Sequence, residues 1–120
     1  MTFIVKLEKR DNYLRAQVEG EFALNKSINL FSVIINSCEA NQINRILIDA
    51  RKIEKKITVL ERTFLGAYLR KEAKDEMKIA IIATKAQIQP RKVLEKYVVN
   101  RGLDLKVFFD ASKAIQWLEP

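Results

Sequence analysis

Ile43-Asn44-Arg45-Ile46-Leu47-Ile48-Asp49-Ala50 is a short apolar run that ends at a carboxylate. Ile46, Leu47 and Ile48 place apolar side chains on both faces of an extended chain, as a strand covered on both sides requires. Residues 43–50 are therefore predicted to be a buried strand. The strand patterns before this run and the helix patterns after it decide the fold class.

The composition is that of one globular domain covering residues 1–120. Hydrophobic residues make up 48% and charged residues 31%, and three Gly and two Pro leave no linker or repeat. Cys38 is the only cysteine and histidine is missing, which excludes an intramolecular disulfide, a Cys/His metal cluster and the usual catalytic triads. We expect a reducing cytoplasm, no metal, no cofactor, and a packing role for Cys38 on a helix face.

The start of the chain and its charge limit the function classes. Residues 1–6 run straight into a strand pattern without the features of a signal peptide, and no apolar run approaches the roughly 18 residues of a membrane span. The net charge of +7 suggests an acidic partner, but the cations are scattered, as on solvated helix faces. Few exposed aromatics and no recognition motif argue against nucleic-acid binding.

Strand patterns precede residues 43–50. Residues 3–9 and 13–19 both alternate between apolar and polar, and the polar residues 10–12 between them predict a tight turn, so the pair is expected to form an antiparallel hairpin. A helix follows to about residue 40, with Asn25 or Ser27 as its cap. Its apolar stripe consists of Ile28, Phe31, Ile35 and Cys38.

Helices and strands alternate after the central run. Residues 51–57 read as a basic loop, and Thr58-Val59-Leu60-Glu61 has the spacing of a capping box that opens a helix to about residue 73. Residues 78–84 and 103–109 are predicted strands. A helix beginning near Pro90 and ending at Gly102 lies between them, and Asp110 caps a final helix. The buried residues expected on the capping-box helix are Leu60, Phe64, Ala67 and Tyr68, widened by Val59 and Leu65.

This element order predicts an α/β domain with one antiparallel edge, because right-handed crossovers give parallel pairing from the second strand onward. Crossover helices between sequential strands fall on one side of the sheet. Residues 78–84 are nevertheless apolar on both faces. The second face is expected to be covered by the N-terminal hairpin, by the last helix or by a second copy, and a homodimer is the preferred alternative.

A family resemblance rests on Arg45-Ile-Leu-Ile-Asp49, Lys78-Ile-Ala-Ile-Ile-Ala83, Asn100-Arg101-Gly102 and Val107-Phe108-Phe109-Asp110 with Ala114 and Trp117-Leu118. In these portions the chain resembles a STAS domain, and more closely the SpoIIAA-like proteins of bacteria. The resemblance covers nearly the whole chain. It implies a SpoIIAA/STAS-like mixed five-stranded sheet, an antiparallel N-terminal hairpin followed by parallel strands, with four helices. It also implies sequential strand order and a central position for residues 43–50.

The resemblance also points to Thr58. STAS anti-sigma-factor antagonists carry a phosphorylated Ser in an Asp-Ser-Ser-Gly signature, which falls here on Ile57-Thr58-Val59-Leu60. Thr58 therefore occupies the phosphoacceptor position. The Asp and the Gly of the signature are replaced, and the capping box explains Thr58 without modification.

Ligands of open parallel sheets gather at the carboxyl ends of the strands, where helix N-termini converge. Near Thr58, Pro90 and Asp110 such N-termini would favour an anion, although a solvated basic loop is the simpler explanation. Asp49 and Asp110 could pair or hold a cation, but Asp110 is more simply a cap. The expected ligand-binding or partner-binding residues are Asp49, Arg51, Lys52, Lys55, Lys56, Thr58 and Lys85.

The preferred functional hypothesis is a non-catalytic STAS-like signalling or protein-interaction module that recognises an unknown protein partner through the edge around the capping-box helix. The alternative is a domain that binds a small anionic ligand or a lipid with the basic loop. An enzyme is the least favoured class, because the chain has no histidine and no nucleophile with a base beside it.

Overall fold

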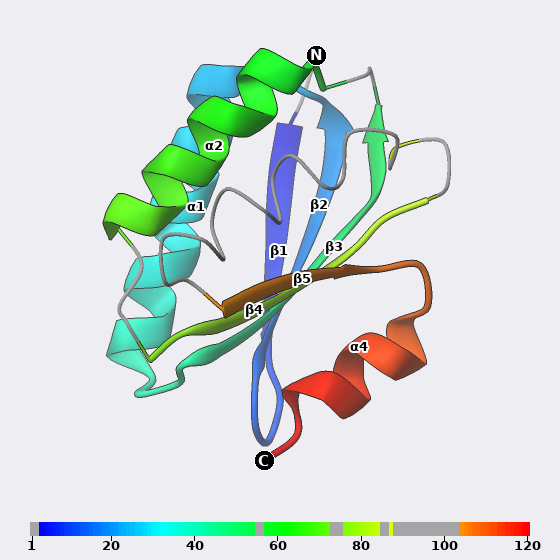
Figure 1. The fold of residues 1–120 in the computed structure, drawn as a ribbon. Helices are drawn as coiled ribbons and strands as arrows, with labels where there is room; N and C mark the ends of the chain where they lie inside the picture. Colours follow the sequence, from blue (N-terminus) through cyan, green and yellow to red (C-terminus); the bar gives the residue numbers. More distant parts are fainter. Residues whose placement is uncertain (1–2, 55–56, 73–75, 85–86, 88–103) are drawn as a thin grey trace.

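A five-stranded sheet in the order β1-β2-β3-β4-β5 forms the centre of the molecule (Figure 1). The computed structural model describes residues 3–54, 57–72, 76–84, 87 and 104–120, without the side chains of Val59 and Arg62. The elements are β1 (Phe3–Lys9), β2 (Leu14–Glu21), α1 (Leu24–Ala40), β3 (Arg45–Glu54), α2 (Val59–Glu72), β4 (Lys78–Ile82), β5 (Asp104–Phe108) and α4 (Ala111–Leu118).

The topology confirms the predicted fold class. β1 and β2 pair antiparallel, and the pairs β2–β3, β3–β4 and β4–β5 are parallel. The predicted central strand is β3, the third of the five strands. The described residues contain three helices, and the helix predicted to begin near Pro90 and end at Gly102 lies outside them.

The larger core lies between one face of the sheet and the neighbouring helices α1 and α2 (Figure 1). Ile46 and Ile48 of β3 belong to this core, together with Cys38 of α1 and Leu69 of α2. Burial raises the pKa of the Cys38 thiol to about 11, with a smaller contribution from Glu39. The thiol is therefore protonated at neutral pH and serves as a packing group, as predicted.

The second face of the sheet is covered by α4, within the same chain (Figure 1). Leu47 and Ile82 pack there against Ala114 and Leu118, and all four side chains are buried. Of the three expected covers, the last helix is the one observed. On this face α4 removes the apolar residues of β3 and β4 from water, whereas Ile4 of β1 stays 41% exposed. The apolar face of β4 is thus covered without a second copy, and the homodimer stays a prediction.

Two cations from the sheet hold the C-terminal end of α4. The Lys78 ammonium donates to the Trp117 carbonyl at 2.7 Å and lies 4.3 Å from the centroid of the Trp117 ring. The Arg45 guanidinium donates to the Leu118 carbonyl. These carbonyls have no partner within the helix, so Arg45 and Lys78 supply the positive groups that its last turn lacks.

The start of α1 differs from the prediction. Ala23 is the N-cap and has no side-chain capping bond, and Ser27 is buried inside the helix with no hydrogen-bond partner for its hydroxyl. The physical reason is Phe22, which is 3% exposed and packs edge-to-face on Phe3. This contact fixes the chain beside the sheet, so the helix begins directly after it and before Asn25.

The buried face of α2 also differs from the prediction. Leu65 and Leu69 are buried, whereas Leu60 is 76% and Phe64 is 57% exposed. The helix carries two apolar stripes, one through residues 60 and 64 and one through residues 65 and 69. Periodicity alone does not choose between them. Packing against the larger core selects the second stripe.

We expect Leu69→Ala to lower the free energy of unfolding by about 2–5 kcal/mol, because it leaves a cavity in the core. Phe64→Ala should change it by no more than about 0.5 kcal/mol, since the ring is largely in water. Urea denaturation followed by circular dichroism measures both values. A larger loss in Phe64→Ala than in Leu69→Ala would contradict the observed orientation of α2.

Candidate functional site

The candidate site lies where β3 ends and α2 begins. Four of the residues expected there are described: Asp49, Arg51, Lys52 and Thr58. Lys55, Lys56 and Lys85 lie outside the described residues.

The first half of the predicted basic loop is a strand. Residues 51–54, here called the β3 extension, continue β3 and pair with β2, where Lys52 is opposite Glu19 and Glu54 is opposite Glu21. β2 runs on to Glu21 and so offers a backbone partner over this whole length. The composition suggested a loop because charged side chains predominate, but the ladder to β2 satisfies those backbone groups of the extension that point toward β2.

β4 ends at Ile82, so no strand among the described residues lies on the other side of the β3 extension. The side-chain amide of Gln87 takes that place, donating to the carbonyls of Ala50 at 3.0 Å and Ile53 at 3.2 Å. The amide oxygen of Gln87 accepts from the Thr84 backbone N–H at 2.8 Å, which orients the group. Gln87 therefore supplies donors for two backbone carbonyls at this edge of β3.

A β-bulge sets which way the charged side chains of β3 point. Between the pairs Gln17–Asp49 and Glu19–Lys52 the register shifts, so β3 contains one residue more than β2. The extra residue interrupts the alternation of side chains between the two faces. As a result Asp49, Arg51 and Lys52 all lie on the face of the sheet that also bears α4.

Asp49 is a buried carboxylate held by two arginines. It is 4% exposed. Its oxygens accept from Nε and Nη2 of Arg51 at 3.0 and 2.8 Å, from the Arg51 backbone N–H at 3.2 Å, and from Nη2 of Arg15 at 3.3 Å. The two-point contact with Arg51 is the fork geometry that binds a carboxylate most strongly. Arg51 is thus committed to Asp49.

The same contacts set the protonation of Asp49. Burial alone would raise the pKa of its carboxyl group, but the hydrogen bonds and charge of Arg51, with the charge of Arg15, outweigh burial and lower the pKa below its usual value. Asp49 in turn raises the pKa of Arg51. Asp49 is therefore ionised and paired at neutral pH, which makes it a poor general base.

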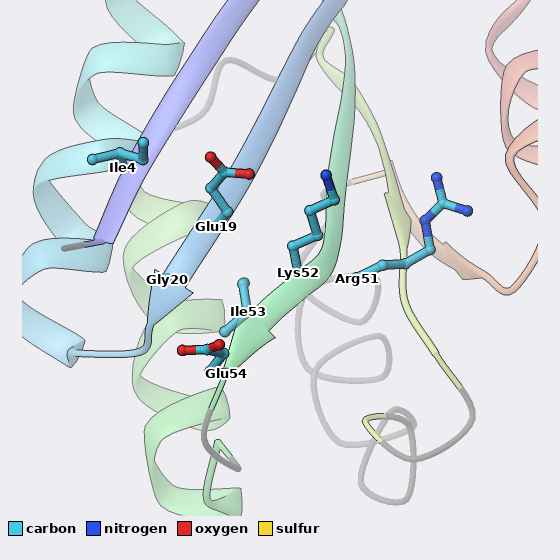
Figure 2. A pocket seen from close by; sticks show the side chains of 7 residues that line it. All are labelled: Ile4, Glu19, Gly20, Arg51, Lys52, Ile53 and Glu54. Atoms are coloured by element: carbon cyan, nitrogen blue, oxygen red, sulfur yellow. The ribbon is translucent and has the colours of Figure 1, made fainter. Parts of the chain in front are cut away.

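A depression with a volume of about 600 Å³ lies next to this cluster. Figure 2 shows Ile4, Glu19, Lys52 and Arg51 following one another across β1, β2 and β3. Glu54 also lines the depression. Two carboxylates therefore accompany the two cations, so the described part of this surface has no excess of positive charge for an anion.

Thr58 forms the predicted capping box. Its backbone N–H donates to Oε1 of Glu61 at 3.0 Å, and the Glu61 backbone N–H donates to the Thr58 hydroxyl oxygen at 3.1 Å. The hydroxyl also donates to Oε1 of Glu61 at 3.0 Å. Both residues thus satisfy the free N–H groups at the start of α2. Two apolar side chains, Leu60 and Phe64, stand exposed just beyond this cap.

Asp110 is the predicted cap, with its Oδ1 accepting from the Ser112 backbone N–H at 2.8 Å. Asp49 and Asp110 thus each have partners of their own. Among the residues that the structure describes, no group of three or more His, Cys, Asp or Glu could hold a metal ion. No described helix is long and apolar enough to cross a membrane.

Arg15 and Gln87 belong to this site although no sequence pattern marks them. Arg15 lies on the polar side of the hairpin, but its contact with Asp49 depends on the register between β2 and β3, which the sequence does not reveal. Gln87 stands in a polar segment with no periodic signal. Its role depends on where β4 ends.

Residues 10–118 match the family described as "Domain of unknown function (DUF4180)". The chain belongs to the DUF4180 family. No curated protein matches its sequence. Two crystal structures have a similar fold over 98% of this chain and 94% of their own. One is an anti-sigma factor antagonist from Mycobacterium paratuberculosis, with a TM-score of 0.70 and 14% identity. The other is an uncharacterized protein of the DUF3478 family with a SpoIIAA-like fold from Shewanella loihica PV-4, with a TM-score of 0.60 and 20% identity.

These neighbours confirm the STAS and SpoIIAA-like resemblance at the level of the fold. At this sequence identity they show the fold alone. The residues of the site in this DUF4180 chain are therefore interpreted from their own contacts.

We expect Thr58→Ala to lower the free energy of unfolding by about 0.5–2 kcal/mol, because it removes the side chain that caps α2. Thr58→Ser keeps the hydroxyl and should retain most of the stability. Thermal melts of the two variants beside the wild type test this, and equal melting temperatures for all three would contradict the cap.

The lowered pKa of Asp49 predicts a pH dependence of stability. The folded carboxyl binds a proton less readily than the unfolded one, whose pKa is about 3.9. The ionised Asp49 therefore stabilises the folded state fully at pH values above the unfolded pKa. This stabilisation is lost as the pH falls through the lower pKa of the folded state. Asp49→Asn should cost about 1–3 kcal/mol near neutral pH. Urea denaturation measures the free energy of unfolding of both proteins, and the difference between them should shrink below about pH 4. A difference that does not change with pH would show that the charge of Asp49 contributes nothing to stability.

Proposed function

We propose that this DUF4180 chain is a non-catalytic signalling module that binds a partner protein through the surface around the start of α2. The observation that carries the proposal is the exposure of Leu60 and Phe64, at 76% and 57%. They are four residues apart, so they project from the same side of the helix one turn from each other. This is the spacing with which helices present apolar anchors to a protein groove.

The chemistry of the described residues supports a binding role over an enzymatic one. Cys38 is buried and its pKa is raised, so it is a poor nucleophile. Asp49 is neutralised by Arg51 and Arg15. The fold shared with an anti-sigma factor antagonist agrees with a signalling module of this kind.

The contacts favour a protein partner over a small anion or lipid. Arg51 and Arg15 already bind Asp49, and Lys52 lies opposite Glu19 in the strand register. An anion would have to compete with the carboxylates already present. Carboxylates do not compete for the exposed apolar side chains of Leu60 and Phe64 on α2.

Thr58 is the natural place for modification within this proposal. A phosphate there would remove the hydroxyl donor and bring negative charge beside the Glu61 carboxylate, which is 3.0 Å from the hydroxyl oxygen. The capping box would then open next to Leu60. Phosphorylation of Thr58 would therefore alter the surface that we propose for the partner.

The test is affinity capture from the lysate of the source organism with the tagged chain carrying Leu60→Asp and Phe64→Asp. We expect the partner captured by the wild type to be lost, because two charges replace the apolar anchors. Val33→Asp is the matched control, since Val33 is 48% exposed on α1 and lies outside the proposed surface. Circular dichroism melts should show that both variants are folded.

The opposite pattern would contradict the proposal. If the same partner binds the variant with both changes on α2 and is lost in Val33→Asp, the interaction surface is on α1. Capture that neither variant affects would also exclude the start of α2.

A further inference from the structure

β1 is an edge strand whose outer side has no strand beside it in the described sheet. The direction of its backbone groups follows from the hairpin turn, where the Arg10 N–H donates to the Tyr13 carbonyl at 2.9 Å. In an antiparallel ladder the residues that bond to the neighbouring strand alternate. The register therefore directs the N–H and C=O groups of Val5, Leu7 and Lys9 outward, away from β2.

The sequence of β1 is complementary to itself in one register. An antiparallel pair of β1 strands with its two-fold axis at Leu7 places Leu7 opposite Leu7 and Val5 opposite Lys9 of the second copy. Both are hydrogen-bonded pairs, since these residues have outward backbone groups. Lys6 then lies opposite Glu8 of the second copy, twice across the axis, in the pairs whose side chains approach most closely.

We propose that β1 is a self-association surface and that its partner is β1 of a second copy of this chain, paired antiparallel about Leu7. The charges select this register. With the axis at Val5, Lys6 would face Ile4, and an axis at Lys6 would bring two ammonium groups together although its backbone pairing is equally possible. Only the axis at Leu7 gives Lys6 an opposite charge directly across the interface.

The exposed side chains of β1 agree with this pairing. The side chains of Lys6 and Glu8 are 68% and 56% exposed, so both can reach a second copy although Lys6 lies 3.6 Å from Glu19 and Glu8 lies 2.5 Å from Arg10. Leu7 is 38% exposed and would meet its own copy on the axis. A two-fold axis closes the assembly at two chains, joining the two sheets into one without an open end on this side.

This surface is separate from α2, so the inference does not depend on the proposed function. The contact is a single pair of strands, and we expect a weak dimer whose population rises with concentration. Sedimentation of the wild type at up to about 500 µM is the first measurement, because interfaces below about 1,200 Å² usually form weak complexes. We expect a species of twice the 13.9 kDa monomer mass.

Charge reversal tests the register. Lys6→Glu should abolish the dimer, because it places carboxylates opposite each other at both positions. The double variant Lys6→Glu/Glu8→Lys restores opposite charges across the interface and should restore the dimer, although inside each chain it worsens the contacts with Glu19 and Arg10. Circular dichroism melts report whether each variant is folded.

Cysteine crosslinking tests the same register without changing charge. Leu7→Cys should form a covalent dimer under mild oxidation, because the two α-carbons of a hydrogen-bonded pair are about 5.5 Å apart, within disulfide reach. Val5→Cys is the matched control and should not crosslink, since Val5 lies opposite Lys9. The native Cys38 is fully buried and should not react.

Three outcomes would overturn the proposal. The first is a wild type that remains a monomer throughout the concentration series. The second is a dimer that persists in Lys6→Glu. The third is crosslinking through Val5→Cys in place of Leu7→Cys, which would show a different register.

Discussion

Burial of both faces of β3 is the constraint on which the rest of the structure depends. Ile46 and Ile48 require cover on one side and Leu47 requires it on the other. The crossover helices α1 and α2 cover the first side, and right-handed connections keep them there. The chain must therefore supply a further element for Leu47. This is the role of α4, which is eight residues long and too short to be stable as an isolated helix.

The attachment of α4 shows how packing and charge act together. Ala114 and Leu118 bury its apolar stripe, while Lys78 and Arg45, at the starts of β4 and β3, bind the carbonyls at its end. These two cations also lie on the face that α4 covers. A short helix is thus fixed at its apolar side and at its C-terminus by the strands that need it.

The fold could be predicted from the sequence because its signals are local and repeated. The alternation in residues 3–9, the apolar run around Leu47 and the spacing of Thr58 and Glu61 each specify an element without knowledge of the others. The helix expected near Pro90 lies outside the described residues and stays a prediction. For α4, the pattern predicted the helix, and the choice between it and a second copy required the structure.

The site was predicted less well, because it depends on register and on where strands end. The basic residues were identified, but Arg51 and Lys52 belong to a strand whose existence depends on the length of β2 and on Gln87. Arg15 comes within reach of Asp49 only after the parallel pairing of β2 and β3 is set. For α2, two apolar stripes fit the same period, and only contact with the core excludes Leu60 and Phe64 from the interior.

The distribution of charge limits what the net charge of +7 means for function. Among the described residues, Arg15 and Arg51 bind Asp49, and Arg45 and Lys78 bind carbonyls of α4. These four cations have structural partners, so they do not form a free field for an acidic ligand. The proposed recognition of a partner therefore depends on exposed apolar side chains, which are Leu60 and Phe64 on α2 and Leu7 on β1.

Because β1 is at the edge of the sheet and α2 connects β3 to β4, pairing through β1 would leave both copies of α2 accessible. Two linked copies of one surface bind a multivalent partner more tightly than a single copy, so self-association would strengthen the proposed signalling contact without adding a new one.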